Sequence, residues 1–201
     1  MEFRGHYKAE SPAKEQDRAA IVEELLAAGV PPRQVDDVNN WSVSCYASYY
    51  NRPLILAVLI KAAGPEATAM VRRRAHPAHG TNGWTALHTA SRAGHTECVR
   101  VLLSAGAGLD INVKNPLRMT ALDCAIRWSP YISPLLLAAG ATIPPDADNA
   151  YLRKVAAAGG FPTYEKAHRQ ALVTTFAAKF PRLPTDVVGH VAAFAFHVGY
   201  Y

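Results

Sequence analysis

Residues 85–107 read TALHTASRAGHTECVRVLLSAGA, and residues 120–141 follow the same pattern as TALDCAIRWSPYISPLLLAAGA. Both copies open with Thr-Ala-Leu, carry alanine at the sixth place, and close on a leucine run followed by Ala-Gly-Ala. Their first residues, Thr85 and Thr120, lie 35 positions apart. A sequence that repeats itself at this period is typical of an array of stacked units.

Two weaker copies of the second half lie upstream, at Leu54 to Gly64 and at Ile21 to Gly29. The glycines that close the four copies are 35, 42 and 34 residues apart, at Gly29, Gly64, Gly106 and Gly140. The longer middle gap predicts an insertion between the second and third copies, at His76 to Gly80. We therefore predict an all-α protein with a tail or cap at 1–18, about four helix-turn-helix units at 19–145, and a C-terminal helical segment at 146–201.

Local signals within the third copy predict two short helices. Thr85 can cap a helix that shows Leu87, Ala90 and Ala93 on one side, and Gly94 suits the left-handed residue that ends it. A second helix at 96–105 then shows Val99, Leu102 and Leu103 on one face. Neither helix can bury its apolar side alone, so neighbouring units have to stack.

Residues 80–112, GTNGWTALHTASRAGHTECVRVLLSAGAGLDIN, resemble an ankyrin repeat, and the weaker resemblance extends from Ile21 to Ile143. The fourth copy departs from the family pattern, because Asp123 stands in the place of a histidine and Arg118 in the place of a glycine. Its turn between helices, at residues 128–130, is also unusual. The resemblance implies a solenoid of helix pairs that binds a protein target on its concave face.

Ankyrin arrays bind through hairpin tips and through the exposed edge of the first helix of each unit. By register, the resemblance assigns these positions to Trp41, Tyr50, Thr81, Asn82, Trp84, Arg92, Leu117, Met119, Arg127 and Trp128. Trp, Tyr and Arg are enriched in interface hot spots, so we expect at least one of Trp84 and Trp128 to contact the partner. The alternative for Trp41 and Tyr49 is that they fill core space in a degenerate unit.

The segment after the array predicts further helices. Asp148 to Ala158 could form a short helix, and Thr163 could cap a longer one at 164–179, with an apolar face of Ala167, Ala171, Leu172 and Phe176. Pro181 ends that helix.

The next residues, LPTDVVGHVAAF at 183–194, resemble the opening of an F-box. The matching positions are Leu183, Pro184, Asp186, Val187, Val191 and Phe194. Truncated F-box-like (PRANC-like) ends follow ankyrin arrays in large-DNA-virus proteins, and this resemblance implies docking on the Skp adaptor of a cullin–RING ubiquitin ligase. Two alternatives stay open: the segment only caps the solenoid, or it is similar to a SOCS box that binds elongins.

The residue types that carry catalysis do not gather in a recognisable pattern. The sequence shows no hydrolase triad, no glycosidase carboxylate pair and no phosphate loop, which favours a non-enzyme without cofactor. His76, His79, His88 and His95 lack the cysteine pairs and spacing of a zinc site. His88 takes the place where the family's histidine bonds the backbone of adjacent units, so we expect a structural role.

Composition bounds the remaining classes. Three dispersed cysteines indicate a reducing compartment, cytoplasm or nucleus, and the polar N-terminus is unlike a secretory signal. The longest apolar stretches contain Lys, Arg, Gly or Pro, so we expect no membrane span. The net charge is +5, and the basic run at 72–74 fits a solvated helix end or a contact with an acidic partner or nucleic acid. Nucleic acid is disfavoured, because such a contact would need aromatic or further basic residues near this run.

Overall fold

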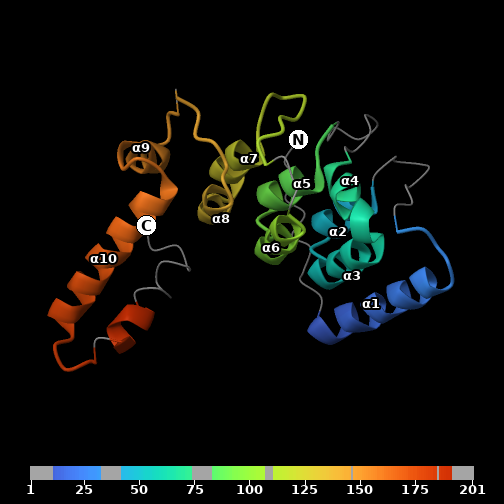
Figure 1. Cartoon of the computed structure of the whole chain (residues 1–201), viewed down its shortest axis with the longest axis horizontal. Helices are drawn as coiled ribbons and strands as arrows, with labels where there is room; N and C mark the ends of the chain where they lie inside the picture. Colours follow the sequence, from blue (N-terminus) through green and yellow to red (C-terminus); the bar gives the residue numbers. More distant parts are fainter. Residues whose placement is uncertain are drawn as a thin grey trace. The chain divides into compact units, whose positions relative to one another are not determined.

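The computed structural model describes residues 11–32, 42–73, 83–106, 111–145, 147–184 and 186–191. The chain divides into two units, Met1–Ala139 and Gly140–Tyr201. Every regular element in the described residues is a helix, which confirms the predicted all-α class (Figure 1). The elements of the first unit are α1 (Pro12–Ala27), α2 (Val43–Tyr49), α3 (Pro53–Ala63), η1 (Gly64–Glu66), α4 (Ala67–Arg72), α5 (Ala86–Ala93), α6 (Thr96–Ser104), α7 (Ala121–Trp128), η3 (Pro130–Ile132) and α8 (Ser133–Ala138).

The helices of the first unit stack as pairs in two layers. In one layer α5 packs between α2 and α7, and in the other α3 packs against α6 (Figure 1). The pairs α2–α3, α5–α6 and α7–α8 connect the two layers. This arrangement confirms the predicted solenoid, because each helix buries its apolar side against the next pair.

Threonine caps begin the first-layer helices of the third and fourth copies. The side chains of Thr85 and Thr120 accept a hydrogen bond from the third helical residue of α5 and α7 respectively. The side chain of that third residue bonds back to the cap's backbone N–H, which completes a capping box in both helices. The repeated Thr-Ala-Leu therefore fixes where each first-layer helix starts.

The buried faces of these helices are narrow and contain small residues. Leu87 and Ala90 of α5 are 3% and 0% exposed, and the corresponding Leu122 and Ala125 of α7 are 1% and 0% exposed. Ala93, which we placed on the same face as Leu87, is exposed instead, because it lies in the last turn of α5 before the chain reverses at Gly94. The alanines allow the first-layer helices to approach closely.

The second and third copies are separated by an inserted helix that the sequence analysis did not predict. The chain leaves α3 through Gly64 at φ +51, forms η1, and continues as α4. Ala67, Met70 and Val71 of α4 are buried, so this insertion is part of the core. The predicted insertion at His76 to Gly80 lies outside the described residues.

One stretch reaches the length and apolarity of a membrane span, contrary to our expectation. Residues Pro53–Arg72 contain a window with a mean hydropathy of 1.6. The structure interrupts this stretch at Gly64 and buries Leu56 and Leu59 of α3 where that helix packs on α1, α2 and α6. The apolar composition of this stretch is accounted for by packing within the unit. A single stretch of this kind is weak evidence for a membrane-spanning helix.

The first copy contributes α1, which packs on α3 in the second layer. The Glu15 carboxylate accepts a 3.0 Å hydrogen bond from the Leu54 backbone N–H at the start of α3. Gly29 follows α1 at φ +91, as Gly64 and Gly140 follow α3 and α8 at φ +51 and +93. The predicted repeat end at Ile21–Gly29 is therefore the second half of a helix followed by a left-handed glycine, as in the other copies. The helix itself begins earlier, at Pro12.

The second unit contains α9 (Ala150–Ala157) and α10 (Phe161–Lys179). Asn149 caps α9, while α10 begins at Phe161 after Gly160, so the expectation that Thr163 caps this helix is wrong. Leu152, Val155 and Phe161 are buried where the two helices meet. The predicted apolar face of α10 is not buried, because α9 covers only the first part of this long helix; its four residues are Ala167, Ala171, Leu172 and Phe176.

Candidate partner-binding surface

Two tryptophans and two arginines from neighbouring repeats meet beside α5 and α7. The Arg92 guanidinium lies 5.3 Å from the ring centroid of Trp84 and 5.0 Å from that of Trp128. The Arg127 guanidinium lies 5.3 Å from the Trp128 ring, and the two indoles are 6.5 Å apart. We call these four residues the Trp–Arg cluster. Contacts of this kind hold a flexible cation in place over an aromatic face.

The members of the Trp–Arg cluster differ in exposure. Trp84 is only 2% exposed, so this predicted contact residue belongs to the core. Its buried ring packs against the Arg92 guanidinium. Trp128 is 41% exposed, Arg127 is exposed and Arg92 is half-buried. Of the two tryptophans for which we expected a partner contact, Trp128 is the accessible one.

Neither arginine of the cluster forms an ion pair with a carboxylate in the described part of the chain. A guanidinium that stacks on a ring through its face keeps its N–H groups at the edge, where they can bind a planar anion. The cluster therefore combines an apolar indole surface with two cations that are held in place.

The turn after Trp128 positions this side chain on the preceding repeat. The Ser129 hydroxyl donates a 3.1 Å hydrogen bond to the Arg92 carbonyl, and the Tyr131 hydroxyl donates a 3.0 Å bond to the Gly94 carbonyl. A side chain on Gly94, which has φ +76, would also collide with the Tyr131 hydroxyl, since an ideal Cβ would lie 1.9 Å from it. The sequence analysis missed both roles, although the unusual 128–130 turn marked the place.

His88 fixes the same two repeats at the other end of α5. Its Nδ1 lies 2.8 Å from the Thr85 hydroxyl oxygen, and its Nε2 lies 3.1 Å from the Met119 carbonyl oxygen, so Nε2 donates across to the next repeat. The ring is 1% exposed. The structural role predicted for His88 is confirmed by these bonds.

The hairpin tip before α7, residues 114–119, presents a second set of predicted contact residues. Leu117 is 65% exposed, and Met119 is half-buried with its carbonyl bonded to His88. Asn115, which is 3% exposed, closes the tip, because its backbone N–H donates to the Met119 carbonyl and its side-chain oxygen accepts from the Met119 N–H. This closure holds Leu117 outward. Thr81 and Asn82, at the preceding tip, lie outside the described residues.

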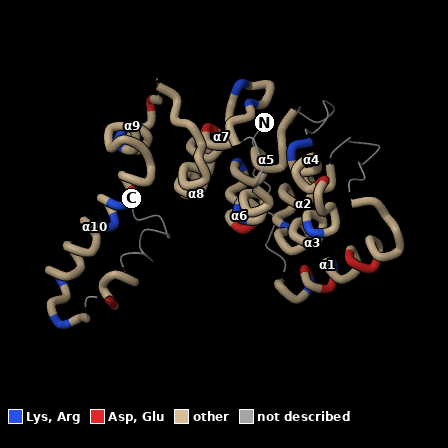
Figure 2. Tube along the Cα trace, in the orientation of Figure 1, with Lys and Arg blue, Asp and Glu red and all other residues tan. Residues whose placement is uncertain are grey.

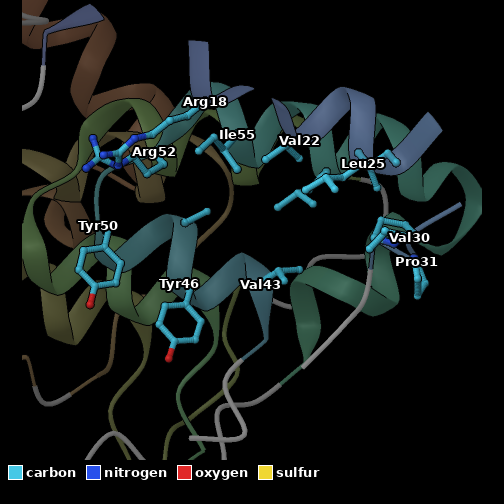
Figure 3. Close-up of a pocket in the computed structure, with 14 residues that line it drawn as sticks. Arg18, Val22, Leu25, Val30, Pro31, Val43, Tyr46, Tyr50, Arg52 and Ile55 are labelled. Atoms are coloured by element: carbon cyan, nitrogen blue, oxygen red, sulfur yellow. The ribbon is translucent and has the colours of Figure 1, made fainter. Parts of the chain in front are cut away.

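A hydrophobic groove of about 670 Å³ lies between α1, α2 and α3 at the N-terminal end of the array. The predicted contact residue Tyr50 lines it, together with Tyr46 of α2 and Val22 and Leu25 of α1 (Figure 3). Trp41, also predicted for this unit, lies outside the described residues. Tyr50 thus lines a groove that no residue of the Trp–Arg cluster lines.

The F-box-like segment contains a short helix at 186–191. Leu183, Val187 and Val191 are 43%, 37% and 41% exposed, and Pro184 and Asp186 are exposed as well. Val188, which the resemblance did not use, is the buried residue, at 2% exposure. Phe194 lies outside the described residues.

The thiols and histidines of the described residues do not form a reactive or metal-binding group. Cys45, Cys98 and Cys124 are free and buried, and burial raises their pKa values to about 11, 12 and 12. No group of three or more His, Cys, Asp or Glu side chains comes together in the part of the chain that the structure describes. Thiols that stay protonated act as small apolar core residues.

Similar proteins confirm the identity of the repeat. Residues 70–146 match the family model described as ankyrin repeats (3 copies). The chain is 37% identical over 95 residues to a glycerophosphocholine phosphodiesterase of Schizosaccharomyces pombe, across 47% of this chain and 7% of that protein. It is 51% identical over 47 residues to the human NAD-capped RNA hydrolase NUDT12, across 23% of this chain and 10% of that protein. The chain thus spans a tenth or less of the length of these curated relatives.

The matched range contains α5 to α8, which carry the Trp–Arg cluster and the hairpin tip. The helix pairs, their capping boxes and the His88 bridge are the structural counterpart of this match. Residues 70–146 are therefore ankyrin repeats, part of an all-α solenoid whose general role is to bind a protein partner.

Proposed function

We propose that this chain is an adaptor whose array holds a protein target on the surface formed by α5, α7 and the hairpin tip at 114–119. The observation that carries the proposal is the Trp–Arg cluster, in which an exposed indole lies beside two arginines that have no carboxylate partner in the described residues. Buried interface cores are enriched in Trp and Arg. Leu117, 65% exposed at the tip, adds an apolar contact.

Binding rather than catalysis fits the side chains that the surface offers. In the described residues Arg92 and Arg127 lie beside indole rings, and burial raises the pKa of the Cys124 thiol, which keeps that thiol protonated. We further propose that the protein works in a reducing compartment of a eukaryotic or host cell, cytoplasm or nucleus, because its three cysteines are buried and unpaired.

Affinity capture from a eukaryotic cell lysate, read by mass spectrometry, tests the target-binding role. The full chain should retain a protein that the double variant Trp128→Ala/Arg127→Ala loses, because both exposed members of the cluster are removed. Arg100→Ala is the matched control, since Arg100 is exposed on α6 and its ion-pair partner in the described residues is Glu97. A target retained equally by all three chains would contradict the proposal.

A second candidate role concerns the C-terminal unit. We propose that the 183–191 segment docks the chain on ligase machinery through the Skp adaptor, in the way its F-box-like sequence implies. The supporting observation is that three of its apolar side chains, Leu183, Val187 and Val191, face solvent although they flank the buried Val188. Exposed apolar side chains in one short segment are a common feature of interaction sites.

A pull-down with purified Skp and elongin adaptors tests this second role. Binding to Skp that is lost in Leu183→Ala/Pro184→Ala supports it, and binding to elongin would favour the SOCS-box alternative. Binding to neither adaptor would leave the segment as a cap of the array. Deletion of 161–201 would then lower stability without removing an adaptor.

A further inference from the structure

We propose that the target presents an acidic, extended segment to the Trp–Arg cluster and the hairpin tip at 114–119. This inference rests on the proposed target-binding function and adds the chemistry of the partner.

The surface carries cations that the protein itself does not neutralise. Lys114 and Arg118 on the hairpin tip join Arg92 and Arg127 of the cluster, and none of the four forms an ion pair within the described part of the chain. Figure 2 shows basic residues in the loop before α7 and at the end of α4, and acidic ones on α1, α6 and α7.

The carboxylates in the described residues near this surface are already used. In the described residues 83–106 and 111–128 they are Glu97 and Asp123. Glu97 lies 3.5 Å from Arg100 on α6, and Asp123 accepts bonds of 2.7 and 2.8 Å from the backbone N–H and hydroxyl of Thr120. Within the described residues, an acidic partner therefore meets cations for which no free carboxylate competes.

The geometry of the cluster suits carboxylates in particular. Because the Arg92 and Arg127 guanidiniums lie over the Trp128 ring, at 5.0 and 5.3 Å from its centroid, they are held in place before binding and lose less side-chain entropy on contact. Their N–H edges match the two oxygens of a carboxylate, and the 41% exposed indole can cover an apolar neighbour in the same segment.

Arg118 provides an independent observation. Its φ is +58, a left-handed conformation that favours glycine, and its backbone N–H donates a 2.8 Å bond to the Asn115 carbonyl that closes the turn. The ankyrin pattern has glycine at this place, whereas this chain keeps an exposed cation there. A charged residue kept at a strained backbone position supports a functional role for its side chain.

The distance to be covered sets the length of the segment. The eight residues of α7 span about 12 Å, at roughly 1.5 Å per residue, between the hairpin tip and Trp128. An extended chain advances about 3.3 Å per residue, so roughly four residues cover this length from the tip to the cluster. Nucleic acid fits less well, because a strand would need several exposed rings on which successive bases stack.

Selection from a random twelve-residue peptide display library on the full chain tests the inference. We expect the selected peptides to be enriched in Asp and Glu next to an apolar residue. Arg92→Gln/Arg127→Gln should lose this enrichment, and Arg100→Gln should keep it. Neutral or basic peptides would overturn the acidic segment while leaving the target-binding function intact, whereas failure of any peptide to be selected would count against both.

Fluorescence anisotropy with the best selected peptide gives the second readout. We expect Arg127→Gln, a change at an exposed side chain, to weaken binding about tenfold, as loss of one charge-assisted hydrogen bond implies. Arg118→Gly should weaken binding while raising the unfolding midpoint, a pair of opposite effects that a purely structural residue does not give.

A fluorescein-labelled oligo(U) of twelve nucleotides serves as the competing probe. We expect it to bind more weakly than the acidic peptide and to be displaced by it. Tighter binding of oligo(U) that is lost in Arg92→Gln/Arg127→Gln would overturn the proposal in favour of nucleic acid.

Discussion

The third and fourth repeats begin with the same threonine cap but place different residues three positions later. In the third repeat His88 closes the cap and also reaches the Met119 carbonyl of the next repeat. In the fourth, the Asp123 carboxylate closes the cap by accepting a 2.7 Å bond from the Thr120 backbone N–H, and in the described residues it bonds to no further repeat. The cap forms within one helix start, whereas the hydrogen bond from His88 needs a carbonyl of the following repeat as its acceptor. His88 therefore couples two repeats, whereas Asp123 stabilises the start of its own helix.

The largest expected effect separates these two residues. His88→Ala removes a buried ring, the cap and the bridge, and should lower the free energy of unfolding by about 3 kcal/mol. Asp123→Ala removes a cap alone and should cost about 1 kcal/mol. Urea unfolding followed by circular dichroism measures both. His88→Asp, which keeps the cap without the bridge, should fall between them, and equal losses for His88→Ala and Asp123→Ala would refute the distinction.

The next effect concerns the turn that joins the two repeats. Gly94→Ala forces a side chain into a left-handed position and against the Tyr131 hydroxyl, so we expect a loss of about 2 kcal/mol. Gly29→Ala is the matched control, because Gly29 has φ +91 with open space around it and should cost about 1 kcal/mol. Thermal unfolding of the two variants measures the difference. If Gly94→Ala costs no more than Gly29→Ala, Tyr131 does not lock the turn.

A smaller effect tests the contact of the third repeat with the second. His95 Nδ1 lies 2.8 Å from the Ser48 carbonyl oxygen, and burial lowers the pKa of His95 below its usual 6.5, partly offset by this hydrogen bond. A lowered folded-state pKa means that the unfolded chain binds the proton more tightly. Stability contributed by neutral His95 is therefore present above pH 6.5 and decreases as the pH falls below it, by at most about 1.4 kcal/mol per pH unit.

Urea midpoints measured between pH 7.5 and 5 give this dependence. His95→Asn should flatten the part of the curve just below pH 6.5, since it removes the titrating ring. His190→Asn, which removes a histidine of the C-terminal unit, is the control. An unaltered slope in His95→Asn would assign the pH dependence to other groups.

The smallest expected effect is a gain. Arg118→Gly relieves a φ of +58 in the hairpin tip of the fourth repeat and should raise the free energy of unfolding by about 0.5 to 1 kcal/mol. The gain is limited because glycine also increases the freedom of the unfolded chain. Lys114→Gly at the same tip serves as the control without a left-handed residue, and a larger gain there would contradict the strain.

The binding surface was only partly predictable. The register of the repeat led to Trp128, Arg92 and Arg127, because these follow the Thr-Ala-Leu start at fixed helical spacing. The same register also led us to expect an exposed Trp84, which is only 2% exposed. Its burial depends on the side chains that pack around the ring, and the register does not contain this information. The roles of Ser129 and Tyr131 were not predicted, because each hydroxyl bonds to a carbonyl 37 residues away in the preceding repeat, that of Arg92 and that of Gly94.

The sequence by itself determined the features that depend on near neighbours in the chain. The Thr85 and Thr120 caps, the left-handed Gly94 and the helix periodicity are formed within a few residues, so the pattern alone places them. Tertiary structure decided which side chains are covered: it buried Trp84 and Val188, folded α4 into the core and joined Arg92 to Trp128. Burial depends on elements that stacking brings together from distant parts of the chain, and no local pattern contains that information.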